Sequence, residues 1–320
     1  MEEGNQEEDN VTRVTEFILL GFRGPQTLIL FMFVLFLLMY ILTLWGNVAI
    51  IILVSTNHQL HTPMYFFLCN LSFLEIWYTT ASIPKILLIF LAKSRSISYA
   101  GCILQLYFVF SLGSTEQFLL SVMAYDRYLA ICYPLHYNII MDISLSNKLA
   151  FCCWLAGFLI VSIPAYLITT LTFCGPNVIN NLYCSIDSWI VLSCTDTRLI
   201  ELASFIIAII VILGSCMMSF LSYICIICTI LHIPSVKGRQ KAFSTCSSHL
   251  FLLLIWYGST IFLFVKPSKK MSLETNKVMN IFSLIVVPLL NPFIYTLRNR
   301  EVKECLKHLT ALASVLTINV

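Results

Sequence analysis

Residues 27–55 read TLILFMFVLFLLMYILTLWGNVAIIILVS, a run that contains no charged side chain. A helix of about 20 mostly apolar residues is enough to cross the hydrocarbon core of a bilayer. Backbone groups in lipid must form their hydrogen bonds within their own segment, which excludes irregular chain across that core. The run therefore predicts a membrane-spanning helix.

Six further stretches of similar character follow, at 63–91, 99–132, 148–170, 199–231, 240–265 and 274–297. The chain is 59% hydrophobic and only 11% charged, whereas soluble domains carry about 25% charged residues. We expect an all-α membrane protein, a seven-transmembrane helix bundle over 27–297. Residues 1–26 form an extracellular tail, and 298–320 a cytoplasmic tail with a short amphipathic helix, since Val302, Leu306 and Leu309 recur at helical spacing.

Orientation follows from features outside the spans, because lysine and arginine are almost evenly divided between the two sides. The triplet Asn10-Val11-Thr12 is a glycosylation sequon, which favours an extracellular N-terminus at the plasma membrane. The cysteines of the loop 171–198 favour the same oxidising side. Four cysteines lie on this side of the predicted bundle, Cys102 at the outer end of its span and Cys174, Cys184 and Cys194 in the loop, and four cysteines leave three pairings open.

Several motifs appear from the first span to the last. They are Gly46-Asn47, LHTPMYFFL at 60–68, MAYDRYLAIC at 123–132, KAFSTCSSHL at 241–250 and PLLNPFIYTLRN at 288–299. An isolated Asp-Arg-Tyr triplet is weak evidence, but the whole ordered set resembles the signature of odorant receptors among the rhodopsin-like G-protein-coupled receptors. The loop 171–198 is similar to that of the tetrapod-type branch.

The resemblance implies binding of a small, neutral, hydrophobic odorant and activation of a stimulatory olfactory-type G protein, which raises cyclic AMP. It implies the disulfides Cys102–Cys184 and Cys174–Cys194. It makes Arg127 the contact for the G protein, restrained at rest by Asp126 through a charge-assisted hydrogen bond. Snorkelling of Arg127 to the headgroups is the simpler alternative. The full set of switch residues is Asp126, Arg127, Tyr128, Tyr223, Lys241, His249, Asn291, Pro292 and Tyr295.

The expected ligand site lies between the third, fifth, sixth and seventh spans. Helical spacing aligns Leu106, Val109, Phe110, Gly113, Ser114 and Gln117 on the third span. The resemblance adds Ile207, Val211, Tyr257, Thr260, Ile261 and Phe264. This uncharged lining suits a small apolar molecule held by one or two hydrogen bonds, although each position could equally serve bundle packing. The sixth span has Tyr257-Gly258 where many related receptors have a hinge proline, so we expect ligand contact there to move that helix.

Two carboxylates, Glu75 and Glu116, lie in the middle of spans, where each costs on the order of 2.5–3.5 kcal/mol on insertion scales. Glu116 precedes Arg127 by about three helical turns and shares its face. The resemblance groups Asn47, Glu75, Glu116 and Asn291 around one buried polar site, which holds a sodium ion or a proton in related receptors. The alternative is a neutral, hydrogen-bonded cluster. The family more often has aspartate at position 75.

Other functions fit less well. A transporter would show inverted repeats, and a channel would show a ring of polar pore residues. An opsin needs a lysine in the seventh span, and Val278–Leu297 has none. No nucleophile–base pair suggests an enzyme, no dense basic cluster suggests nucleic acid, and we expect neither cofactor nor metal. Cys225 and Cys228 have zinc-like spacing but lie in an apolar run. A non-olfactory chemosensor of the same fold remains an alternative.

Overall fold

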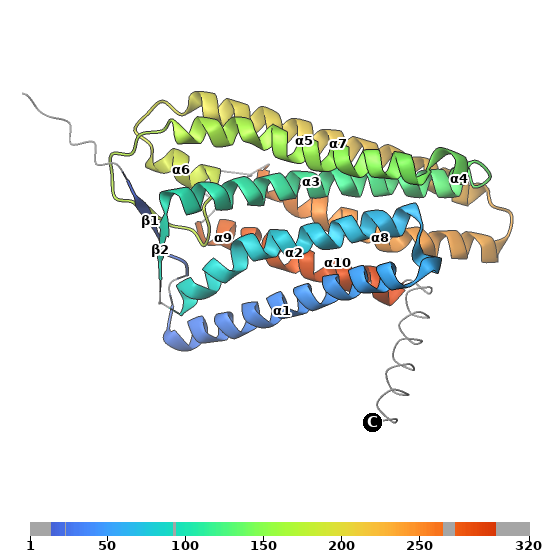
Figure 1. Cartoon of the computed structure of the whole chain (residues 1–320), viewed down its shortest axis with the longest axis horizontal. Helices are drawn as coiled ribbons and strands as arrows, with labels where there is room; N and C mark the ends of the chain where they lie inside the picture. Colours follow the sequence, from blue (N-terminus) through green and yellow to red (C-terminus); the bar gives the residue numbers. More distant parts are fainter. Residues whose placement is uncertain (1–13, 23, 92–93, 265–272, 299–320) are drawn as a thin grey trace, which may run out of the picture.

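The computed structural model describes residues 14–22, 24–91, 94–264 and 273–298. Within this part of the chain, seven long helical segments run side by side along one axis (Figure 1). This arrangement confirms the all-α bundle expected from the apolar runs. The segments are α1 (Gln26–Thr56), α2 (Pro63–Phe90), α3 (Tyr99–Cys132), α5 (Ile143–Thr169), α7 (Arg198–His232), α8 (Val236–Phe264) and the continuous run α9 (Leu273–Ile281), η2 (Phe282–Val286) and α10 (Val287–Arg298).

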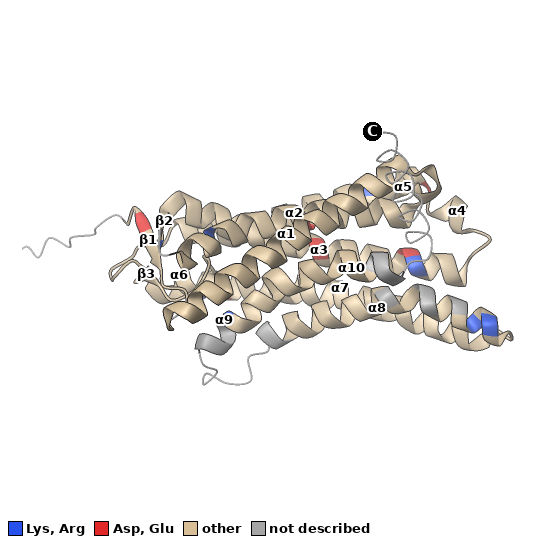
Figure 2. Cartoon of the chain, turned by 90° about the horizontal axis from the view of Figure 1, so that it is seen from below, with Lys and Arg blue, Asp and Glu red and all other residues tan. Residues whose placement is uncertain are grey.

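Six of these segments are long and apolar enough in their described residues to cross a membrane. The exception is α8, whose apolar part, His249–Ile261, is shorter. Its first turns are polar and include Lys237 and Arg239. Figure 2 shows the charged residues mainly toward the two ends of the bundle, with few acidic residues between them. Helix α8 thus begins about one turn before the predicted span 240–265, whose last residue lies outside the described residues.

The outward faces of the bundle are apolar. Phe31 and Trp45 on α1 are 63% and 68% exposed, and Phe205 and Phe220 on α7 are 63% and 64% exposed. In water such large apolar surfaces would promote association. Against lipid tails they carry no such cost, which agrees with a multi-pass membrane protein.

Helix α5 begins at Ile143, earlier than the predicted start at 148. Asp142 precedes it, and its carboxylate accepts a hydrogen bond from the backbone N–H of Leu145 at 2.7 Å. Such a cap satisfies one of the amides left unpaired at a helix N-terminus. A polar segment before the apolar run is therefore helical as well.

Helices α3 and α5 approach closely at Gly157. A methyl group at this position would lie 2.1 Å from Thr115 Oγ1, 2.8 Å from Thr115 N and 3.0 Å from the carbonyl oxygen of Ser111. Two of these atoms belong to the α3 backbone, which cannot rotate away as a side chain can. Only glycine allows this approach of the two helices.

Gly157→Ala is expected to destabilise the bundle by about 1–3 kcal/mol, the usual cost of overpacking. Thermal unfolding of the purified protein measures the effect. Gly214→Ala on α7 is the matched control, because no atom lies within 4 Å of a methyl group there. Alanine favours helix over glycine, so the control should be unchanged or slightly stabilised. Equal unfolding temperatures for the two variants would show that the α3–α5 contact is not this tight.

The last long segment contains a π-helical turn, Phe282–Val286, directly before α10. Pro288 follows this turn and has no N–H to donate to the carbonyl four residues earlier. One turn further along α10, Pro292 packs on α1. A methyl group at Gly46 of α1 would lie 3.0 Å from Pro292 Cβ and Cγ. The motif residues Gly46 and Pro292 thus let α1 and α10 come together.

A small sheet closes one end of the bundle (Figure 1). Its strands are β1 (Glu16–Leu19), β2 (Ser96–Ser98) and β3 (Val178–Ile179), in the order β2-β1-β3. Strand β1 pairs antiparallel with β2 and parallel with β3. We call this end the sheet end, and the opposite end, where Arg127 lies, the Arg127 end. The short helix α6 (Ile186–Leu192) lies at the sheet end, and η1 (His58–Leu60) and α4 (Tyr137–Ile140) lie at the Arg127 end.

Candidate functional site

Two disulfides hold the long loop at the sheet end. Cys102 at the start of α3 is bonded to Cys184, and Cys174 is bonded to Cys194, with Cα–Cα distances of 5.5 and 5.9 Å. These are the pairings that the resemblance implies. The first bond ties the loop to α3, and the second closes the loop on itself.

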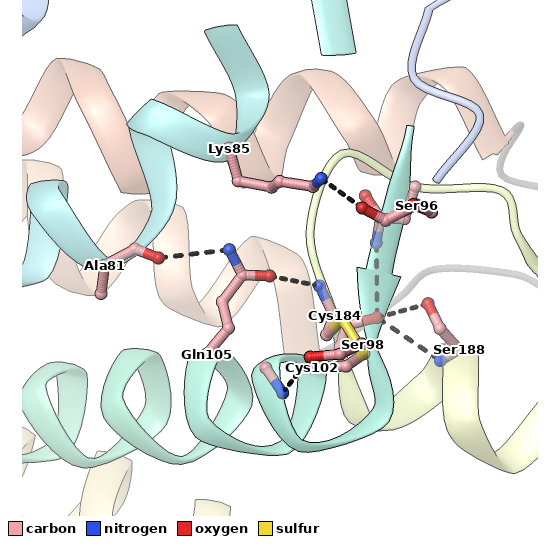
Figure 3. The surroundings of a disulfide bond; sticks show 11 residues. Ala81, Lys85, Ser96, Ser98, Cys102, Gln105, Cys184 and Ser188 are labelled. Atoms are coloured by element: carbon pink, nitrogen blue, oxygen red, sulfur yellow. Dashed lines mark hydrogen bonds between the residues drawn. A yellow bond between two sulfur atoms is a disulfide. The ribbon is translucent and has the colours of Figure 1, made fainter. Parts of the chain in front are cut away.

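Gln105 adds a second link between the loop and the helices (Figure 3). Its side-chain amide donates to the carbonyl of Ala81 on α2 at 3.2 Å. Its carbonyl oxygen accepts from the backbone N–H of Cys184 at 3.0 Å. Gln105 was not among the predicted site residues, although its place one turn after Cys102 puts both on one face of α3.

A buried polar network lies where the predicted ligand residues of α3 and α8 meet. The hydroxyl of Tyr257 is 3.2 Å from Ser219 Oγ and 3.5 Å from Ser121 Oγ. Ser215 donates to the side-chain carbonyl of Gln117 at 3.0 Å. The network joins α3, α7 and α8. The serines were missed, but Ser215 and Ser219 have the spacing of one helix face within an apolar run.

The other predicted ligand residues differ in exposure. Leu106, Val109, Val211 and Thr260 are buried, Phe110, Gly113, Ser114 and Ile207 are half-buried, and Ile261 is 41% exposed. A methyl group at Gly113 would meet Tyr78 of α2 at 3.9 Å, so this position faces α2. The side chain of Phe264 lies outside the described residues.

Two cavities open on the bundle away from this network. One of about 330 Å³ is lined by residues of α1, η1, α2 and α5, and one of about 80 Å³ lies between α1 and α10. Neither is lined by a predicted ligand residue. Tyr257, in contrast, is 7% exposed and closely surrounded.

Three of the four residues of the predicted polar site come together. Asn291 donates to Glu75 Oε1, and the two carboxylates, Glu75 and Glu116, lie close enough to interact electrostatically. Both are at most 1% exposed. Among the described residues, Glu75 Oε2 and Asn291 Oδ1 have no hydrogen-bond partner. Asn47 is also buried, but its amide donates to Thr43 of its own helix at 3.0 Å.

Trp256 is a further member of this site. Its indole N–H donates to Glu116 Oε1, so the carboxylate on α3 is joined to α8 one residue before Tyr257. Trp256 was not among the predicted site residues. An indole inside a span needs a hydrogen-bond partner, and that requirement was the available signal.

At the Arg127 end, Asp126 accepts two sets of hydrogen bonds. Arg127 donates to Asp126 Oδ2 from Nη2 at 2.6 Å and from Nε at 3.1 Å. Tyr137 of α4 donates to Asp126 Oδ1 at 2.7 Å. Burial and then the nearby Asp126 raise the pKa of Tyr137 well above its usual range, so its hydroxyl remains a donor. Tyr137 was not among the predicted switch residues.

Tyr223 and His249 form a second contact at this end. The hydroxyl of Tyr223 is 2.9 Å from His249 Nδ1 and donates to the carbonyl of Cys246 at 3.2 Å. These bonds join α7 to α8 near Arg127. The two helices are therefore tied together next to the arginine.

The remaining predicted residues are less informative. Tyr128 is half-buried and lies near Tyr125 and Tyr133, with ring centroids 6.0 and 5.7 Å apart. The side chains of Lys241 and Tyr295 lie outside the described residues, as do Asn10 and the predicted amphipathic helix beyond Arg298.

The known proteins that this chain resembles are olfactory receptors. The family model described as olfactory receptor matches residues 36–312. The chain is 61% identical to "Olfactory receptor 6F1" of Homo sapiens and 59% identical to "Olfactory receptor 287" of Rattus norvegicus, in each case over 93% of this chain and 96% of the relative. It is 51% identical to "Olfactory receptor 6B1" of Homo sapiens, over 94% and 96%.

These matches cover the helices, the disulfides and the contacts around Arg127, and they agree with the motifs in the sequence. The relatives are receptors and not enzymes. The chain belongs to the olfactory receptor family and is an odorant receptor, a multi-pass G-protein-coupled receptor built as a seven-transmembrane bundle.

Proposed function

We propose that this receptor binds a small, neutral, hydrophobic, volatile molecule inside the bundle and activates a stimulatory olfactory-type G protein, which raises cyclic AMP. The network around Tyr257 carries this proposal. It offers hydroxyl and amide groups at the base of an otherwise apolar region. Such a surface binds an apolar molecule that carries one hydrogen-bonding group.

The same network gives a route from ligand to G protein. Tyr257 and His249 are on α8, and their hydroxyl and ring bond to Ser219 and Tyr223 on α7. A ligand that binds better when these contacts change will shift the population toward that state. In our proposal α8 then moves away from Arg127, and the arginine exchanges Asp126 for the G protein.

The buried carboxylates suit a shared proton or a sodium ion. Two adjacent carboxylates in hydrocarbon repel each other when both are charged. Glu75 Oε2 and Asn291 Oδ1 lack partners among the described residues. Glu75 Oε2 would carry the proton, whereas both oxygens would coordinate the ion. Either one would supply the positive charge that lets Glu75 and Glu116 remain together.

We place the sheet end outside the plasma membrane and the Arg127 end in the cytoplasm. The disulfides at the sheet end require an oxidising compartment. The G protein then meets Arg127 from the cytoplasm. In this orientation the sequon at Asn10 is luminal during synthesis.

The test is expression of the chain with a stimulatory olfactory-type G protein and a screen of volatile compounds for cyclic AMP production. We expect at least one neutral hydrophobic compound to give a saturable response. A response confined to charged, water-soluble compounds would contradict the proposed ligand class.

Tyr257→Phe is expected to raise the half-maximal concentration of such an agonist about fivefold to tenfold, because a buried hydrogen bond contributes about 1 kcal/mol. Tyr166→Phe is the matched control, since Tyr166 is 69% exposed on α5. Dose–response curves at equal surface expression measure both. An unchanged curve for Tyr257→Phe would remove Tyr257 from the ligand mechanism.

Tyr137→Phe is expected to raise agonist-independent cyclic AMP several-fold. The lost hydrogen bond to the Asp126 carboxylate is charge-assisted, and such bonds contribute about 1.5–3 kcal/mol. Without it, Asp126 restrains Arg127 less in the resting state. The measurement is basal cyclic AMP per receptor at the cell surface, with Tyr166→Phe again as control. Basal signalling at or below the unmodified level would show that Tyr137 is no restraint.

A further inference from the structure

The N-terminal segment is built into the sheet end as its middle strand. Successive backbone amides are bonded to its neighbours, with Ile18 N donating to the carbonyl of Asn177 at 2.8 Å, Leu19 N to that of Arg95 at 2.9 Å and Leu20 N to that of Ile179 at 3.0 Å. The partners come from both neighbouring loops. Without the N-terminal segment, β2 and β3 would have no strand between them.

The inward face of this strand is part of the core below it. Phe17 and Leu19 are 1% and 0% exposed. The Phe17 ring lies 4.9 Å from Trp189 of α6. The same apolar cluster contains Cys184 and the predicted ligand residue Leu106. The strand therefore covers the outer part of the proposed ligand region.

After β1 the chain turns at Gly21, which has a φ of +69°. A methyl group at this position would lie 2.9 Å from Ile89 of α2. Positive φ and lack of space both favour glycine. The turn presents the Gly21 carbonyl to α9.

Lys277 of α9 binds this turn. Its Nζ donates to the Gly21 carbonyl at 2.9 Å and lies 5.7 Å from the centre of the Phe22 ring. Lys277 is only 2% exposed. A buried ammonium group is costly unless hydrogen bonds and an aromatic face compensate it. Lysine here thus has a specific partner, unlike a lysine that merely extends to the headgroups.

A second lysine acts in a similar way on β2. Lys85 of α2 donates to the carbonyls of Ser94 and Ser96 at 3.2 and 2.5 Å (Figure 3). The sheet is thus held by ammonium groups from α2 and α9, in addition to the Cys102–Cys184 bond from α3. Of these three attachments, only Lys277 binds the N-terminal segment.

We propose that the N-terminal strand is a roof over the ligand site and that Lys277 is the positioning residue that latches it to α9. The strand β1 joins β2 to β3, and the Lys277 bond attaches the end of this segment to α9. Ligand from outside reaches the bundle when the latch opens. The covering role of the strand rests on the proposed function, because the ligand site itself is proposed. The attachment by Lys277 rests only on the contacts of residues 16–22.

Hydrogen exchange followed by mass spectrometry on the purified full-length receptor in lipid nanodiscs tests the latch without any ligand. Amides in a stable strand exchange only when the strand opens. We expect slow exchange for residues 16–22 in the unmodified receptor. Lys277→Met retains the apolar stem and removes the ammonium, and it should speed exchange of this segment about tenfold, as loss of one charged hydrogen bond implies.

Three variants control for general loss of structure. Lys148→Met changes an exposed lysine on α5 at the far end and should leave residues 16–22 unchanged. Lys277→Arg keeps a buried donor and should retain most of the protection. Phe22→Leu removes the ring beside the ammonium and should give a smaller acceleration than Lys277→Met. In all variants exchange in α5 should remain as in the unmodified receptor.

Two results would overturn the proposal. One is rapid exchange of residues 16–22 in the unmodified receptor, which would mean that no strand forms. The other is equal protection in Lys277→Met and the unmodified receptor, which would mean that the lysine is no latch. A failed odorant screen with the expected exchange pattern would instead count against the proposed ligand and leave the latch in place.

Discussion

Arg127→Ala is expected to abolish agonist-driven cyclic AMP production while the receptor still reaches the cell surface. Arg127 is bonded to Asp126 beside the α7–α8 contact of Tyr223 and His249. In the proposed active state its guanidinium leaves Asp126 and contacts the G protein. Alanine has no group that could replace it, so agonist binding would no longer lead to signalling.

The measurement is maximal cyclic AMP at saturating agonist, divided by surface expression. Arg198→Ala is the matched control, because Arg198 lies at the sheet end with a side chain that is 92% exposed. Its ion pair with Asp196, at 3.8 Å, contributes little in water. If Arg127→Ala reached the surface and signalled normally, the role given to Arg127 would be wrong.

Cys184→Ser is expected to prevent most of the receptor from reaching the cell surface. The Cys102–Cys184 bond closes a loop with a sequence separation of 82. Loss of a native disulfide costs about 2–5 kcal/mol, a large part of the roughly 5–15 kcal/mol that stabilises a typical domain. The Cys184 side chain also lies in the apolar core below β1, so serine there would bury a hydroxyl in addition to losing the bond.

Surface labelling and thermal unfolding of the detergent-solubilised receptor measure this effect. Cys174→Ser should be less damaging, because its bond to Cys194 spans a separation of 20 and shorter loops gain less from closure. Cys228→Ser, at an exposed free cysteine on α7, should behave like the unmodified receptor. Normal surface expression of Cys184→Ser would show that the loop is held by other contacts.

The predicted spans were accurate where composition alone controls structure. An apolar run longer than the bilayer core has no alternative to helix, so α1, α2, α3 and α7 begin and end within a residue or so of their predicted bounds. The largest errors occurred in α5 and α8, where a polar cap or polar turns lengthen the helix beyond the apolar run. The motifs were sufficient to identify the family, since they are specific sequences spread over the whole chain.

The contacts that link distant segments could not be predicted from local sequence patterns. Trp256 meets Glu116, Gln105 meets Cys184 and Lys277 meets Gly21 across sequence separations of 140, 79 and 256. Tyr137 is nearer in sequence to Asp126, but the two residues lie on different helices, α4 and α3, so helical spacing does not relate them. Hydropathy fixes which residues enter lipid, because the cost of exposing polar backbone there is paid segment by segment. Which polar side chains meet depends on how the helices rotate and approach one another, and only the folded bundle determines that.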